Sequence, residues 1–138
     1  MNVTIYGTPC KSMQKAKKWF DKHEISYTER NIRDIPMTVE ELRGVLRLTL
    51  DGTDEIISTR SNIYKQLNLD FDTLPLQELL TLIQKHPGLL RNPIIIDDRR
   101  IQVGYNEDDI RQFLPRKARE LEWLKLRMKQ LYVAEDYQ

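Results

Sequence analysis

The single cysteine of this 138-residue chain lies where a short apolar run meets a helical pattern. Residues 3–6 alternate in polarity as a buried strand does, and a Gly-Thr-Pro turn separates them from Cys10. Apolar residues then recur at helical spacing, so we expect Cys10 to lie at a helix N-terminus. The unpaired N–H groups of a helix start favour an anion, and Lys11 and Lys15 add positive potential. This position therefore favours the thiolate and thiol chemistry.

Two interpretations of this thiol stay open. The order of strand, turn, thiol and helix resembles the thioredoxin-like proteins, whose Cys-x-x-Cys motif opens the first helix and closes as a disulfide. Here Met13 stands at the second position, and a chain with one cysteine forms no intramolecular disulfide. Alternatively, Cys10 is a small apolar side chain that fills space at the helix start.

Composition bounds the classes of protein to consider. The 22 basic and 21 acidic side chains give a net charge of only +1, unlike a stand-alone nucleic-acid binder, so any contact with DNA is local or shared. One cysteine provides no disulfide framework, and no stretch has the length and apolarity of a signal peptide or membrane span. His23 and His86 have no ligand-like spacing with Cys10, so we expect no metal. We expect one cytoplasmic, monomeric domain over residues 1–138 without a cofactor.

The periodicity predicts a sheet interrupted by helices. The first helix extends to about residue 23, and residues 25–32 form a second strand, parallel to the first. Residues 38–86 are helical, beginning with a capping box of Thr38 and Glu41, and Gly52 ends the first helix of this segment. Residues 93–97 and 101–105 form a hairpin.

The C-terminal part is predicted to be helical again. Asn106 caps a helix that buries Ile110 and Phe113. The last segment carries basic residues around an apolar stripe made of Leu121, Leu124, Met128 and Leu131. We interpret it as a solvated surface, with a clamp on the sheet or a weak DNA-facing arm as alternatives, because its acidic residues dilute the positive charge.

Four stretches together resemble the Spx family of transcriptional regulators of low-GC Gram-positive bacteria: residues 51–61 (DGTDEIISTRS), 86–91 (HPGLLR), 93–97 (PIIID) and 102–108 (QVGYNED). The resemblance implies an α/β fold with a thioredoxin-like mixed sheet of about four strands, made by residues 1–37 and 88–138. A helical subdomain of residues 38–87 is inserted into it. It also implies binding to the C-terminal domain of the RNA polymerase alpha subunit and redirected transcription under thiol stress.

The resemblance assigns roles to particular positions. The surface that meets the alpha domain is implied to consist of Arg47, Asp51, Gly52, Thr53 and Asp54, and Pro93 is implied to be cis. Gly52 and Arg47 also have a structural explanation that needs no partner. A turn that requires positive φ would by itself call for glycine at position 52. A cation such as Arg47 near the end of a helix interacts favourably with the helix dipole in any protein. The chain departs from the family in a turn one residue shorter before Cys10 and in Met13.

The alternative is a thiol enzyme, since Spx shares its fold with the glutaredoxin-linked arsenate reductases. Those enzymes surround the oxyanion with three arginines. Arg60 falls at the first position, where local capping or pairing explains it equally well. Asn92 precedes Pro93 at the second, with Arg91 one residue off, and residues 103–105 contain no arginine. One basic group in place of three holds a doubly charged oxyanion poorly, so we expect a regulator and not an enzyme.

Overall fold

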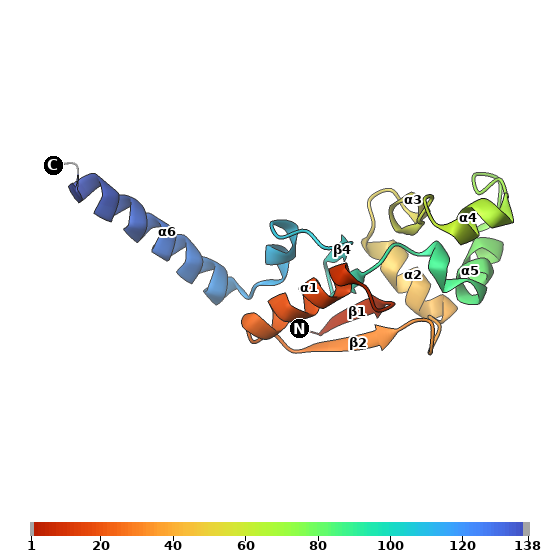
Figure 1. Ribbon diagram of the computed structural model, residues 1–138, viewed down its shortest axis with the longest axis horizontal. Coiled ribbons are helices and arrows are strands. Elements are labelled where there is room, and N and C mark those ends of the chain that lie inside the picture. Colours follow the sequence, from red (N-terminus) through yellow and green to blue (C-terminus); the bar gives the residue numbers. More distant parts are fainter. Residues whose placement is uncertain (1, 137–138) are drawn as a thin grey trace.

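The computed structural model describes residues 2–136 (Figure 1). Its centre is one mixed sheet with the strand order β2-β1-β3-β4. β1 pairs in parallel with β2 and antiparallel with β3, and β3 pairs antiparallel with β4. The strands are β1 (Val3–Gly7), β2 (Tyr27–Asn31), β3 (Ile94–Ile96) and β4 (Ile101–Val103). The expected parallel pair and the hairpin are therefore both present.

Adjacent residues of the two central strands divide the core. Side chains of successive strand residues point to opposite faces of a sheet. Ile5 and Ile95 pack in a cluster with the buried face of helix α1 (Lys11–Lys22), whereas Tyr6 and Ile94 pack with helices that follow β2. The sheet thus separates the helix that begins beside Cys10 from the inserted helices.

The inserted helices lie together at one end of the molecule (Figure 1). They are α2 (Val39–Leu48), α3 (Thr53–Ile56), α4 (Asn62–Leu67), α5 (Leu76–Lys85) and the 3-10 helix η1 (Pro87–Leu89). The capping box predicted at the start of α2 is present: Thr38 accepts from Glu41 N–H, and the Glu41 carboxylate accepts from Thr38 N–H.

The predicted role of Gly52 as a helix stop is wrong. α2 ends at Leu48 because the Thr49 hydroxyl donates to the Leu46 carbonyl at 2.6 Å and Thr49 turns to extended backbone angles. Gly52 instead precedes α3, with φ 72° and ψ −137°. Positive φ was expected, but this conformation lies outside the left-handed helical region and is essentially restricted to glycine.

The C-terminal part differs from the expectation in two ways. Asn106 does accept from the N–H groups of Asp108 and Asp109, but the turn it begins leads into a 3-10 helix, η2 (Asp109–Phe113). Helix α6 (Arg116–Asp136) projects away from the body (Figure 1), and the predicted apolar stripe is exposed. The interpretation of this helix as a clamp on the sheet is therefore wrong. None of the helices in residues 2–136 is both long and apolar enough to span a membrane.

Candidate functional site

The thiol turn, residues 7–10, places Cys10 at the N-cap of α1. Its half-buried sulfur accepts a hydrogen bond from the Met13 N–H at 3.4 Å. A second donor is distant in sequence: the side-chain amide of Asn92 lies 3.2 Å from Sγ. Met13 itself is buried, so the residue at the resolving position of the thioredoxin-like motif is part of the core.

Asn92 fastens the thiol turn to the loop before β3. Its Nδ2 donates to the carbonyl and hydroxyl oxygens of Thr8 at 2.8 and 2.9 Å, and its Oδ1 accepts from the Thr8 N–H at 3.0 Å. A Cβ at Gly7 would lie 2.0 Å from the Asn92 Oδ1, so the close approach requires glycine there. The Asn92–Pro93 peptide bond is cis, as the family resemblance implies.

The two arginines considered for anion binding are not among the donors to the sulfur. Arg60 is exposed in the turn before α4. Arg91 donates its backbone N–H to the Ile56 carbonyl at 2.8 Å and its Nε to the Ile57 carbonyl at 3.2 Å, so this side chain holds the inserted segment. Within the described part of the chain, an asparagine takes the place beside the thiol. Sequence reasoning missed this contact, although the position of Asn92 directly before Pro93 was a signal for it.

A second candidate site is the Gly52 loop, defined as residues 49–54, which connect α2 to α3 and include the first two residues of α3. The Gly52 N–H donates to the Thr49 hydroxyl at 3.1 Å. One carboxylate oxygen of Glu55 accepts from the N–H groups of Leu50 and Asp51, both at 2.8 Å. Local side chains therefore fix the course of this backbone.

The Gly52 loop exposes one large apolar side chain and two carboxylates. Leu50 is 96% exposed, and Asp51, Asp54 and the preceding Arg47 are exposed around it. No atom lies within 4 Å of a Cβ built on Gly52, so this glycine is required by its backbone angles and not by space. The family resemblance had named the charged residues, but it did not name Leu50 or Glu55, whose carboxylate accepts hydrogen bonds from the loop.

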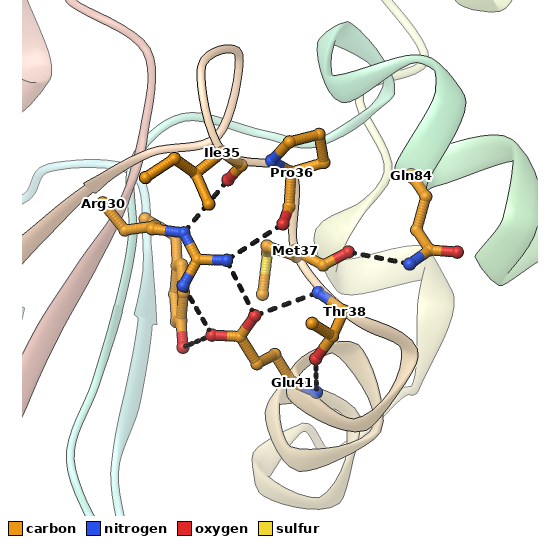
Figure 2. A network of polar contacts seen from close by, with 8 residues as sticks. Arg30, Ile35, Pro36, Met37, Thr38, Glu41 and Gln84 are labelled. Atoms are coloured by element: carbon orange, nitrogen blue, oxygen red, sulfur yellow. Dashed lines mark hydrogen bonds and ion pairs between the residues drawn. The ribbon is translucent and has the colours of Figure 1, made fainter.

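A polar network joins the sheet to the start of α2 (Figure 2). The guanidinium of Arg30 on β2 binds both carboxylate oxygens of Glu41 at 2.9 Å. It also donates to the carbonyls of Ile35 at 3.0 Å and Pro36 at 2.9 Å. Both charged side chains are about three-quarters buried, with 23% and 26% exposed. The pair therefore fixes the connection through which the chain enters the inserted helices.

The same network shifts the pKa values of Glu41 and Tyr6. Partial burial of Glu41 acts to raise its pKa, but hydrogen bonds from Thr38 N–H and Arg30 outweigh burial and hold the pKa below its ordinary value. Burial raises the pKa of Tyr6, and the carboxylate that its hydroxyl contacts at 3.2 Å raises it further. The carboxylate is thus charged at neutral pH. The far end of α2 carries Arg47 and the Gly52 loop, so this network also anchors the helix that presents them.

Comparison with known proteins identifies the family of this chain. The model of the ArsC family matches residues 6–113. A protein of Oceanobacillus iheyensis named global transcriptional regulator Spx 2 is 60% identical over 128 residues, covering 93% of this chain and 95% of that protein. This chain belongs to the Spx family, within the ArsC family. The predicted resemblance to the Spx family is thereby confirmed.

Solved structures agree with the fold of this Spx-family chain. A putative ArsC family related protein from Bacteroides fragilis has a TM-score of 0.71 at 30% identity, over 81% of this chain and 97% of that one. An arsenate reductase from Vibrio cholerae has a TM-score of 0.69 at 23% identity, over 83% and 96%, and shows the fold alone. The predicted α/β fold with a thioredoxin-like mixed sheet of four strands is confirmed.

Proposed function

We propose that this protein is a transcriptional regulator that binds the C-terminal domain of the RNA polymerase alpha subunit through the Gly52 loop and Arg47. It acts in the cytoplasm as a monomer and redirects transcription in the stress response, with promoter DNA as a contact only within the polymerase complex. Its single thiol makes an intramolecular disulfide switch impossible. Binding in this proposal is independent of the oxidation state of Cys10.

The observation that carries the proposal is the combination of order and exposure in the Gly52 loop. Protein interfaces combine an apolar centre with a polar rim, and preorganised loops lose less conformational entropy on binding. Leu50, 96% exposed, supplies the centre, and Arg47, Asp51 and Asp54 supply the rim. The Spx 2 relative, named a global transcriptional regulator, supports the role of a regulator.

Arsenate reduction is the less supported alternative. A nucleophilic thiol at a helix N-terminus suits attack on an oxyanion, and Cys10 has that position. However, the neutral amide of Asn92 lies beside the sulfur, and the Nε of Arg91 is used by the Ile57 carbonyl. Charge-assisted bonds hold oxyanions much more strongly than a neutral amide does. The geometry therefore supports a protein-binding regulator better than a reductase.

The experiment is a calorimetric titration of the isolated alpha C-terminal domain with the full chain and with Gly52→Arg. The parent is expected to bind, and the variant is expected to bind at least about tenfold more weakly, which corresponds to about 1.4 kcal/mol. An arginine strains the positive-φ position and protrudes into the partner surface. Arg43→Ala, exposed on α2 and outside the proposed surface, is the control. Equal affinity of parent and Gly52→Arg would sink the interface assignment.

A further inference from the structure

Helix α1 gathers positive charge on the side turned away from the core. It contains five lysines and one acidic residue, Asp21, so it carries a net charge of +4 in a chain whose formal net charge is +1. The rest of the chain must therefore sum to −3. The concentration of charge on one short helix is a local feature that the overall charge hides.

Four of these lysines form one stripe, which we call the α1 lysine stripe: Lys11, Lys15, Lys18 and Lys22. All four are exposed. At about 100° per residue they fall within an arc of about 60°, directly opposite the buried face of Met13, Ala16 and Phe20. The stripe is thus the crest of the helix and is not part of its packing.

The lysines of the stripe have no acidic partner within 4 Å among the residues whose side chains the structure describes, 2–131. The fifth lysine, Lys17, differs, because it lies on the flank of the helix and pairs with Glu29 at 3.1 Å. Acidic side chains do lie nearby: Glu107, Asp108 and Glu122 share with three stripe lysines the lining of a hollow of about 560 Å³. Glu122 is paired with Arg111, so it is not an ion-pair partner of the stripe.

The stripe matches the phosphate backbone of a nucleic acid in length and charge. From Lys11 to Lys22 it extends for about 16 Å along the helix axis. One strand of duplex DNA carries a phosphate about every 3.4 Å of its axis, so about five phosphates face this length. Flexible lysines serve as point charges for phosphate without reading sequence.

We propose that the α1 lysine stripe contacts the phosphate backbone of duplex DNA when the protein is bound to polymerase. This inference rests on the proposed function, which brings the protein to promoters. The contact is sequence-independent and adds to the affinity of the polymerase complex for DNA. It also differs from the DNA-facing role considered for α6, the other basic helix, because it lies on the folded body.

The test measures binding of a fluorescent 30-base-pair duplex by the preformed complex of full chain and alpha C-terminal domain, from 50 to 200 mM salt. The test variant has all four stripe lysines changed to glutamine, a residue that retains helix propensity. Lys17→Gln is the matched control on the same helix, and Lys117→Gln with Lys125→Gln and Lys129→Gln tests α6. Circular dichroism verifies that each variant is folded.

Each neutralised phosphate contributes about −0.9 to the slope of log K against log salt, so four contacts contribute about −3.6. We expect the stripe variant to lose 3 to 4 units of that slope, about a 100-fold change over this salt range, while Lys17→Gln keeps the parent slope. An unchanged slope in the stripe variant overturns the proposal. A slope lost only in the α6 variant overturns it as well and assigns the DNA contact to α6.

Two further measurements keep this inference separate from the proposed function. Calorimetry with the alpha domain is repeated for the stripe variant and should give the parent affinity. If the parent does not bind the alpha domain, the proposed function fails. The DNA contact is then tested without the alpha domain, by titrating the duplex with the full chain alone at 50 mM salt and comparing the same variants. The stripe variant is also tested with vesicles of anionic lipid. If the substitutions weaken binding to the vesicles but leave DNA binding unchanged, the DNA proposal is overturned and the stripe is assigned to a membrane surface.

Discussion

In both the thiol turn and the Gly52 loop, backbone N–H groups donate to a side chain outside the segment, but the two acceptor residues lie at very different distances along the sequence. Asn92 reaches Thr8 across 84 positions of the chain, whereas Glu55 reaches Leu50 and Asp51 across five and four. The non-local contact ties the thiol turn into the folded body. The local contact orders the Gly52 loop and leaves its side chains outside. The hydrogen bonds of the thiol turn therefore contribute mainly to stability, whereas those of the Gly52 loop mainly order an exposed surface.

The largest effect is expected when the non-local acceptor is removed. Asn92→Ala deprives the Thr8 N–H of its partner and leaves the sulfur of Cys10 with one donor. We expect the free energy of unfolding to fall by about 2 kcal/mol in urea denaturation. Affinity for the alpha C-terminal domain should remain within about twofold of the parent, less than about 0.5 kcal/mol. The exposed Asn62→Ala serves as control, and weakened binding by the folded Asn92 variant would contradict the separation of the two regions.

Removing the local acceptor should give the opposite pattern. Glu55→Ala frees the N–H groups of Leu50 and Asp51, which solvent then satisfies. Stability should change by less than about 1 kcal/mol, but binding should weaken about fivefold to tenfold because the loop must be ordered on association. Calorimetry of this variant beside the exposed Glu40→Ala measures the difference. A Glu55 variant with parent affinity would show that loop order is irrelevant to binding.

The network at the start of α2 should make a smaller, pH-dependent contribution. The pKa of Glu41 in the folded protein lies below its ordinary value of 4.5, so the unfolded chain takes up this proton first as pH falls. The stabilisation is complete above that value and is lost as pH falls through the folded pKa. Glu41→Gln should lower the free energy of unfolding by about 1 kcal/mol at pH 7.

The same variant should also show a flatter loss of stability below about pH 5 than the parent. Glu40→Gln changes the adjacent, more exposed carboxylate, whose nearest cation is 3.8 Å away, and should keep the parent profile. Denaturation curves measured from neutral to acidic pH compare the three proteins. If the free energy of unfolding of the parent and of Glu41→Gln fell in parallel with pH, Glu41 would not be the source of this pH dependence.

Local patterns made most of the fold predictable. Alternation in residues 3–6, the helical spacing after Cys10 and the capping box at Thr38 each depend on neighbours in sequence, and the structure has all three. The position of Gly52 was misjudged because Thr49 ends α2 before the glycine is reached, by a hydroxyl contact that propensity does not reveal. The 3-10 geometry of η2 was missed for a similar reason, since the same apolar residues bury equally well in either helix.

The candidate sites were predictable only where the chain brings its own neighbours together. Cys10 at its N-cap follows from local sequence, whereas the charged residues of the Gly52 loop were named only through the resemblance to the Spx family. The contact of Asn92 with Cys10 depends on pairing of β1 with β3, and the contact of Arg30 with Glu41 depends on how the chain leaves β2. Periodicity carries no information on such long-range pairs.

The most direct test of the account compares the parent and Cys10→Ala, each with reductant and with diamide, in polymerase binding and promoter-specific transcription. The thiol turn and the Gly52 loop are separate in this account, and one thiol forms no internal disulfide. Equal binding and equal transcription in all four conditions are therefore predicted. The account would be contradicted if the parent lost activity on reduction and regained it with oxidant, while Cys10→Ala responded to neither reagent. That result would indicate a disulfide between Cys10 and a partner thiol.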